Sequence, residues 1–307
     1  MRWIKKGLLY ATDQYREWSV THATAPYAFP LGNDIYRVFF STRDSKNRSY
    51  TMWVDVDASS ETWKVINRPE TPAVSPGPLG SFDESGVVGD CVVQNGNRLF
   101  LYYHGFNLGV TVPFRLAIGL AISDGGGENF TKLSEGPLLD RTPTDAYLLA
   151  TPFVVRDNGI WKMWYVSGSR WESTPGGPKH FFHVRYAWSG DGINWVREGK
   201  VCIDYKNDLE YAISRPSVLI ENGVYRMWYC YRASEKAATY RIGYAESGDG
   251  ESWVRMDHLV GIDVSAEGWD SEMICYPHVF RHKGQLFMIY NGNAYGKTGF
   301  GYAVLEE

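Results

Sequence analysis

The sequence predicts an all-β fold, a five-bladed β-propeller with four antiparallel strands in each blade. Three observations support this prediction: a repeated pattern of roughly 60 residues, a 15% content of aromatic residues, and 32 Gly and 14 Pro spread along the chain. Aromatic side chains favour strands, and Gly and Pro favour the tight turns between them. Closed β architectures often exceed the length of an average domain. We therefore expect one domain spanning residues 1–307.

The repeat is clearest in two segments that align without a gap, 64 residues apart. Residues 151–165 read TPFVVRDNGIWKMWY and residues 215–229 read RPSVLIENGVYRMWY. Equivalent positions occur in five copies, separated by 65, 61, 64 and 61 residues: Pro26, Cys91, Pro152, Pro216 and Pro277. Such regular spacing predicts one structural unit for each copy, stacked against its neighbours.

Each copy contains the pattern of four strands. In the fourth copy these are the apolar segment 216–220, the alternating segment 224–230, residues 240–246 and a short strand near Trp253. Four antiparallel strands, repeated radially, make a propeller. The Ser-Gly-Asp-Gly turns between third and fourth strands are predicted to be structural, because Asp bonds its own turn backbone and Gly takes positive φ.

The two ends of the chain predict how the ring closes. The fifth copy stops after its third strand, at residues 302–305, and no repeat precedes the segment 3–10. We expect residues 3–10 to form the outer strand of the last blade and to remove an open sheet edge.

Composition limits which binding partners and which cellular location we expect for this chain. The net charge is −4 and no Lys/Arg run occurs, so we expect no nucleic-acid partner. No apolar stretch is long enough to span a bilayer, and the N-terminus lacks a signal-peptide core. A cytoplasmic location is therefore expected, and the oligomeric state is left open. The four cysteines form no C-x-x-C pair and are expected to be buried free thiols.

Strand order predicts one rim rich in polar and aromatic side chains. Loops leading into first strands and loops leaving second strands share this rim, where carboxylates, arginines and aromatic rings gather. Paired carboxylates can cleave a glycosidic bond, since one protonates the leaving oxygen and the other activates water or attacks the anomeric carbon. We expect Glu210 and Glu272 to be this pair, with Asp83 as a third catalytic carboxylate.

The other rim residues are expected to bind a carbohydrate substrate. They are Arg43, Asp44, Glu84, Asp90, His104, Asp145, Trp171, Arg215, Arg232, Asp270, Tyr276 and Asn291. Arginine forks hold hydroxyl or anionic groups and aromatic faces stack on sugar rings. For Arg215, an ion pair between blades is an equal alternative. No cofactor or metal is expected, because no His pair has ligand spacing.

The repeat pattern resembles a known superfamily. A Pro near each first strand, Met-Trp-Tyr in the second strand, and Tyr-Ala-x-Ser-x-Asp-Gly-x-x-Trp after it are similar to the five-bladed glycosidases. That superfamily contains arabinanases and β-xylosidases (family 43), invertases and levansucrases (families 32 and 68) and mannoside phosphorylases (family 130). The resemblance covers nearly the whole chain and implies the five-bladed fold and chemistry on glycosides.

The catalytic positions differ from that superfamily. The arabinanase and xylosidase branch carries carboxylates just before the Pro of the first, third and fourth blades. Here Ala25, Thr151 and the pair Ser214-Arg215 occupy these places. Any catalytic carboxylates must therefore come from elsewhere on the same rim.

Three functions follow from these patterns. The leading prediction is a glycoside hydrolase acting on a carbohydrate or glycoconjugate. A phosphate-dependent phosphorylase or sugar transferase working on cytoplasmic intermediates is the first alternative, because rim arginines can hold phosphate. A non-catalytic glycan-binding propeller is the second, favoured by the missing superfamily carboxylates.

Overall fold

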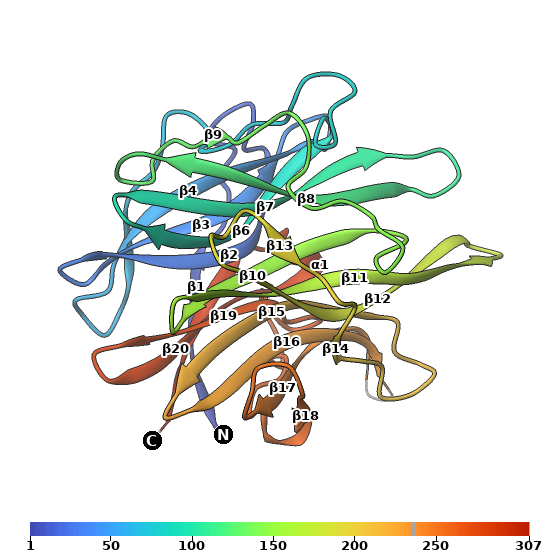
Figure 1. The fold of residues 1–307 in the computed structure, drawn as a ribbon. Coiled ribbons are helices and arrows are strands. Elements are labelled where there is room, and N and C mark those ends of the chain that lie inside the picture. Colours follow the sequence, from blue (N-terminus) through green and yellow to red (C-terminus); the bar gives the residue numbers. More distant parts are fainter. Residues whose placement is uncertain (235–236, 307) are drawn as a thin grey trace.

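The computed structural model describes residues 1–234 and 237–306, and it is almost entirely β-structure (Figure 1). The first two strand groups are β2 (Thr21–Gly32), β3 (Ile35–Arg43), β4 (Ser49–Asp57) and β5 (Lys64–Asn67), then β6 (Gly86–Asn95), β7 (Arg98–Leu108), β8 (Phe114–Ser123) and β9 (Thr131–Lys132). The next group contains β10 (Leu149–Asp157), β11 (Ile160–Thr174), β12 (Gly177–Ser189) and β13 (Trp195–Val196), with β14 (Val201–Ile203) also paired to β12. The last groups are β15 (Ala212–Glu221), β16 (Val224–Ser234), β17 (Ala237–Ser247) and β18 (Val254–Arg255), then β19 (Cys275–His282), β20 (Gln285–Asn291), β21 (Phe300–Leu305) and β1 (Trp3–Tyr10). A 3₁₀ turn, η1 (Asp257–Leu259), and a short helix, α1 (Asn293–Gly296), complete the described elements.

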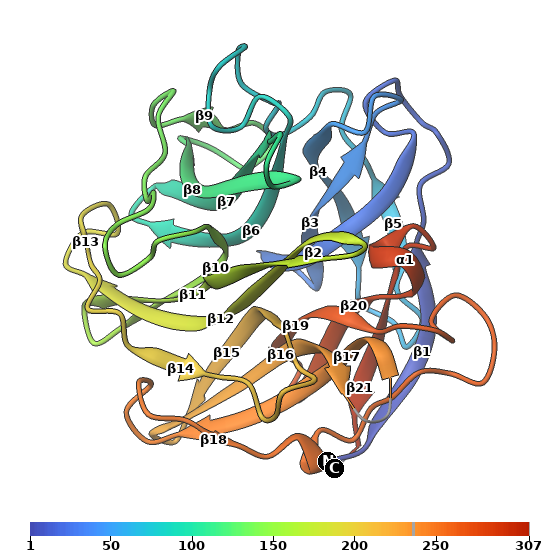
Figure 2. The ribbon, with the colours of Figure 1, turned by 90° about the vertical axis from the view of Figure 1, so that its right-hand side faces the viewer.

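Within each group the strands pair antiparallel in chain order, as the repeat predicted. Single parallel bridges, Ser49 with Gly86 and Phe182 with Ala212, join neighbouring groups into larger sheets. In Figure 2 the groups lie around a common centre, with the first strand of each group innermost. The all-β prediction is confirmed.

The N-terminal strand lies where a fourth strand would lie in the last group. β1 pairs antiparallel with β21, from Trp3 opposite Leu305 to Tyr10 opposite Phe300. The two chain ends are adjacent in Figure 2, and the Glu306 amide donates to the Arg2 carbonyl at 2.9 Å. The expected pairing of residues 3–10 with the last repeat is confirmed.

The core lies between neighbouring strand groups, because both faces of each group are covered. On β16, Met227 and Tyr229 pack on one side with Trp164, while Trp228 faces the other side and packs on Trp3. This follows from the period of two in a strand, which sends successive side chains to opposite faces.

Small residues on third strands make room for the large rings. A Cβ at Gly119 would lie 2.3 Å from the Tyr103 ring, and one at Gly243 would lie 2.6 Å from the Tyr229 ring. Glycine is therefore required at both positions by close packing of a neighbouring tyrosine.

The Ser-Gly-Asp-Gly turns are structural, as predicted. Asp191 Oδ1 accepts from the amides of Ile193 and Asn194, both at 2.8 Å, and Gly192 has φ 79°. These backbone donors, Asn194 first, hold the pKa of Asp191 far below its usual range. All four cysteines are buried free thiols, which confirms that prediction. No helix in the described part of the chain has the length and apolar character to cross a membrane.

Candidate functional site

The first strand of each group bends at the same repeat position. The pairing register shifts there in β2, β6, β10, β15 and β19. Four residues just before or within the shift have left-handed backbone angles: Ala25 (φ 59°), Thr151 (42°), Arg215 (55°) and Tyr276 (53°). Non-glycine residues rarely adopt this conformation, and such strain clusters at functional sites.

These bends surround a cavity of about 300 Å³. Its polar and charged lining includes Arg43, His104, His180, Arg232, Thr151 and Ser214, and its aromatic lining is Phe106, Phe114, Phe182, Tyr240, Tyr276 and Tyr295. Among the described residues, no Asp or Glu lines it. The cavity therefore combines cationic, imidazole and aromatic side chains.

A buried charge network lies beside the cavity. Asp90 is 1% exposed, and its Oδ1 is ion-paired with Arg215, which also donates through Nη2 to the Ala25 carbonyl at 3.0 Å. Asp90 Oδ2 lies 2.7 Å from His104 Nδ1. An ionised carboxylate only accepts, so Nδ1 carries a proton in this pair, and Nε2 is the acceptor nitrogen of the neutral ring. Nε2 has no hydrogen-bond partner among residues 1–234 and 237–306.

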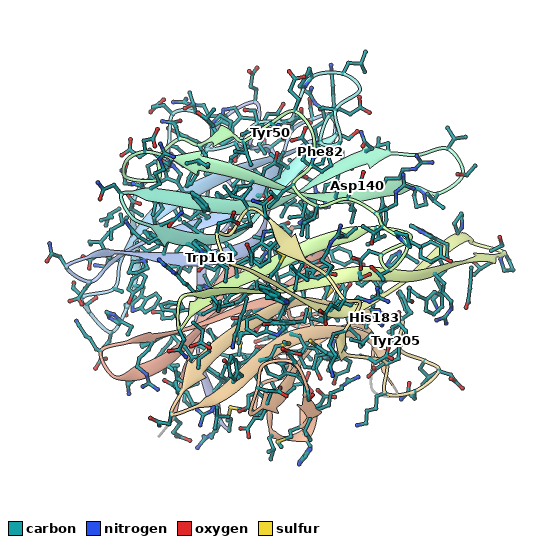
Figure 3. All side chains as sticks on the ribbon, viewed as in Figure 1. Tyr50, Phe82, Asp140, Trp161, His183 and Tyr205 are labelled. Carbon is teal, nitrogen blue, oxygen red and sulfur yellow. The ribbon has the colours of Figure 1, made fainter. Side chains whose placement is uncertain are left out.

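A second histidine–carboxylate pair, His183 with Asp204, differs from the pair of His104 with Asp90. His183 Nδ1 lies 3.2 Å from Asp204 Oδ1, but Arg185 Nε donates to its Nε2 at 3.1 Å. Its ring stacks on Tyr205, with centroids 6.1 Å apart (Figure 3). Both His183 nitrogens are used by the protein, whereas one nitrogen of His104 remains for a ligand.

Arg43, at the end of β3, is a half-buried cation. Its Nη1 donates to Asn47 Oδ1 at 3.1 Å, and no carboxylate of the described chain lies within ion-pair distance. Burial lowers the pKa of Arg43. The pKa of nearby His22 falls to about 4, through burial first and then the charges of Arg43 and Lys297. This corner of the site is positively charged and lacks a described counter-ion.

Arg232, at the end of β16, occupies a second cationic corner. Its guanidinium lies 5.4 Å from the Tyr211 ring centre and 5.8 Å from those of Tyr240 and Tyr295. Burial, followed by the charges of Arg232 and Lys179, lowers the pKa of His180 to about 4. His180 is therefore neutral at pH 7.

Four predicted site carboxylates belong to ion pairs outside the cavity lining. In each, an acid in the loop before a first strand meets a base on or next to a fourth strand. The pairs are Asp83–Lys132 (2.6 Å), Asp145–Arg197 (3.0 Å), Glu210–Arg255 (2.7 Å) and Asp270–Lys5 (2.7 Å). We call these the repeat ion pairs. Lys5 comes from β1, so the N-terminal strand supplies the base that fourth strands supply elsewhere.

A tyrosine on the second strand completes three of these pairs. The hydroxyls of Tyr103, Tyr165 and Tyr290 donate to the carboxylates 20 residues before them in the chain, at 3.1, 3.0 and 2.9 Å. The constant spacing of 20 is visible in the sequence. It identifies Asp83, Asp145 and Asp270 as repeated structural elements.

The remaining predicted residues divide into two sets. Arg43, His104, Arg232 and Tyr276 line the cavity, and Asp90 and Arg215 pair beside it. The equal alternative for Arg215, an ion pair between repeats, is thus present.

The second set does not line the cavity. Glu272 is exposed, Glu84 accepts from the Gly80 amide, Asp44 pairs with Arg48, Trp171 contacts the Phe114 ring, and Asn291 binds backbone groups of Ala23, Ala25 and Gly299.

Sequence reasoning missed several lining residues. Phe114, His180 and Tyr240 lie at or near the starts of third strands β8, β12 and β17. Those starts share a rim with the ends of second strands, so the same topological rule would have found them. Tyr295 was missed because it follows Ala294 in two consecutive left-handed residues, φ 50° and 60°, which turn α1 toward the cavity. The described residues contain no group of three His, Cys, Asp or Glu suited to a metal ion.

Comparison with solved structures shows which known proteins have the same fold. The chain resembles a glycoside hydrolase (TM-score 0.75, 19% identity, covering 98% of this chain and 90% of the other protein). It also resembles a thermostable family-43 glycoside hydrolase (0.67, 17%, 96% and 91%) and the family-32 β-fructofuranosidase BmSUC1 of Bombyx mori (0.64, 17%, 96% and 62%). The chain therefore shares its fold with these glycoside hydrolases, which confirms at the level of the fold the resemblance seen in the sequence and leaves the branch unassigned.

Sequence comparison gives a closer relationship. No family model matches the chain. It is 42% identical over 308 residues to "Uncharacterized protein MT1551" and to "Uncharacterized protein Rv1502", from two strains of Mycobacterium tuberculosis, with both proteins fully covered. The chain belongs to the same family as these proteins.

Proposed function

We propose that the strand groups form a closed five-bladed propeller and that the protein is a glycoside hydrolase whose reaction takes place in the central cavity. The observation that carries this proposal is the Asp90–His104 pair, placed with His104 on the cavity of a glycosidase fold. Asp90 fixes the orientation and the tautomer of the His104 ring. The same arrangement makes histidine a general base in other hydrolases.

The cavity supplies the other requirements of sugar binding. Tyr240, Tyr276 and Tyr295 offer hydroxyls and ring faces on one side, and Phe114 and Phe182 offer apolar faces on another. Aromatic faces stack on sugar rings and exclude water from the reacting bond. In this proposal, His104 Nε2 takes a proton from the water that attacks the anomeric carbon.

This proposal assigns the earlier catalytic candidates to other roles. Glu210 and Asp83 are buried and already neutralised by Arg255 and Lys132. A carboxylate that is paired and hydrogen-bonded on all sides is poorly placed to act on a substrate outside its reach. Glu272 is exposed, and its backbone amide binds Asn293.

The test is sugar release from a panel of aryl glycosides and oligosaccharides. Wild type is compared with His104→Gln, which keeps a similar shape without a base, and with Arg98→Gln, an exposed control that pairs with Asp124. General-base catalysis contributes about 10²–10⁴-fold, so we expect His104→Gln to lose that much turnover and Arg98→Gln to lose none. Full activity of a folded His104→Gln protein would contradict the assignment.

One observation favours a second candidate, a non-catalytic carbohydrate-binding protein. Two carboxylates are the usual tools of glycoside cleavage, and the described lining contains none. Saturable binding of a glycan by wild type, with no turnover on any substrate, would favour this candidate over the hydrolase.

A further inference from the structure

The titratable groups around the cavity include a base but lack a proton donor suited to neutral pH. Burial raises the pKa values of Tyr240 and Tyr276 well above 10, so these phenols hold their protons. His180, with its pKa near 4, has no proton to give at pH 7. His104 has its Nδ1 on Asp90, so in the neutral ring Nε2 is an acceptor. No lysine or carboxylic acid joins them in the described lining.

The cavity lining therefore has no group suited to protonate a leaving group that needs a proton. An alkoxide leaving from a glycoside normally takes a proton from a carboxylic acid. The phosphate of a glycosyl phosphate monoanion leaves as HPO₄²⁻, a stable anion that needs no such proton. It does need positive charge placed where its negative charge develops.

The cavity supplies that charge. Arg43 and Arg232 both line it, and neither has a carboxylate within ion-pair distance in the described chain. Arg232 donates through Nε to the Ala238 carbonyl at 3.3 Å, and Arg43 donates through Nη1 to Asn47. Each guanidinium has five N–H donors, and within residues 1–234 and 237–306 only one of them is used in each. Guanidinium groups match phosphate geometry through paired hydrogen bonds.

The cavity has room for one small ligand. Its volume of about 300 Å³ is near the lower limit for small-molecule sites. A single sugar with one charged substituent fills such a space. That ligand would contact His104 and the two arginines together.

We propose that the substrate is a glycosyl phosphate, a sugar with phosphate on its anomeric oxygen, held by Arg43 and Arg232. This inference rests on the hydrolase proposed above. The water oxygen forms a bond to the anomeric carbon, and the bond from that carbon to the phosphate oxygen breaks, leaving its electron pair on phosphate. The water proton passes to His104 Nε2 and then to solvent, and the phosphate departs from the substrate monoanion as hydrogenphosphate, HPO₄²⁻. The products are the free sugar and inorganic phosphate.

The first test uses inorganic phosphate as the probe, because it does not depend on the identity of the sugar. Thermal unfolding of wild type, Arg43→Gln and Arg98→Gln is measured with phosphate, with sodium glucuronate as the carboxylate arm, and with chloride at equal ionic strength. We expect phosphate to raise the melting temperature of wild type and Arg98→Gln, but not of Arg43→Gln. No stabilisation by phosphate, equal stabilisation of Arg43→Gln, or an Arg43-dependent effect of glucuronate alone would overturn the proposal.

The second test separates this inference from the proposed function. Hexose 1-phosphates of both anomeric forms and the matching dinitrophenyl glycosides are compared as substrates, with release of phosphate or dinitrophenol as the readout. Removing a transition-state donor costs about 10²–10³-fold. We expect Arg43→Gln to lose that much kcat/KM on the phosphate and to lose much less on the dinitrophenyl glycoside, which has no phosphate for Arg43 to hold, whereas Arg98→Gln should lose neither activity.

The outcomes are distinct. If the dinitrophenyl glycoside is cleaved in a reaction that depends on His104, but no hexose 1-phosphate is cleaved, the result supports the proposed hydrolase function and contradicts the proposed glycosyl phosphate substrate. If cleavage of neither substrate depends on His104, the result contradicts both proposals.

Discussion

The repeat ion pairs and the central cavity use the same kinds of residue in opposite ways. At Asp145, two arginines, a tyrosine and a serine all reach one carboxylate that is fully buried. At Arg43, a half-buried guanidinium has only an asparagine side chain as its described partner. A buried charge is costly unless it is paired. Complete pairing therefore indicates a structural role, and an incompletely paired cation on a cavity indicates a place for an anion.

This contrast also explains why our proposal gives the carboxylates of the predicted rim structural roles. In four strand groups, the acid before the first strand ties its loop to a base on or next to the outermost strand. The residues that differ between repeats are those at the bends, Ala25, Asp90, Thr151, Arg215 and Tyr276. In a repeated fold, the recurring residues hold the structure and the unique ones give the site its chemistry.

Breaking a repeat ion pair should have the largest effect. Asp145→Ala leaves Arg185 and Arg197 without their shared carboxylate, and removing one partner of a buried pair costs about 3–5 kcal/mol. We expect that loss in the free energy of unfolding measured with urea, and a smaller loss for Asp145→Asn, which keeps its size. The control is Asp124→Ala, whose ion pair with Arg98 is exposed and where about 0–1 kcal/mol is expected. Equal effects at the two sites would contradict the structural role.

Removing the base supplied by the N-terminal strand should cost less. Lys5 is partly exposed and Asp270 is buried, where Tyr290 also donates to it. Lys5→Met leaves the buried carboxylate with one strong donor fewer, which costs about 1–3 kcal/mol. Urea unfolding of Lys5→Met beside Lys6→Met measures this. An effect no larger than that of Lys6→Met would show that the link between β1 and the last repeat contributes little.

Acid should weaken the fold partly through His180. Its folded-state pKa is about 4 because of burial, Arg232 and Lys179, below the unfolded value of roughly 6.5. As pH falls from about 6.5 to 4, the unfolded chain binds a proton before the folded chain does, so stability is lost across that window. His180→Gln should therefore show a shallower decline of melting temperature between these pH values. His22 and His278, which have lowered pKa values, are present in both proteins. Identical pH profiles would rule out this role for His180.

Glu272→Gln should have the smallest effect. The side chain is exposed and no described residue is paired with it, and surface substitutions of this kind change stability by less than about 0.5 kcal/mol. We expect sugar release and the urea midpoint to match wild type. A large loss of turnover in a folded protein would restore Glu272 as a catalytic residue.

The sequence was sufficient for most of the fold, because the repeat and the strand alternation are local patterns. The 20-residue spacing from acid to tyrosine was also present in it, and would have placed Asp83 and Asp270 among the structural residues. The cavity was harder to predict. Whether Asp90 meets Arg215 or His104 depends on contacts across the ring, since 125 residues separate Asp90 from Arg215. Strand order places the starts of the third strands, with His180 and Tyr240, on this rim, but the loops before these strands vary in length, so the sequence does not show which of their side chains line the cavity.

A crystal structure of the wild-type protein grown with inorganic phosphate tests the central claim most directly. We predict phosphate density in the cavity, with oxygens at hydrogen-bond distance, about 2.7–3.2 Å, from the guanidinium of Arg43, and the repeat ion pairs unchanged. A cavity without phosphate, or phosphate bound instead to a base of a repeat ion pair such as Arg255 or Lys132, would contradict it.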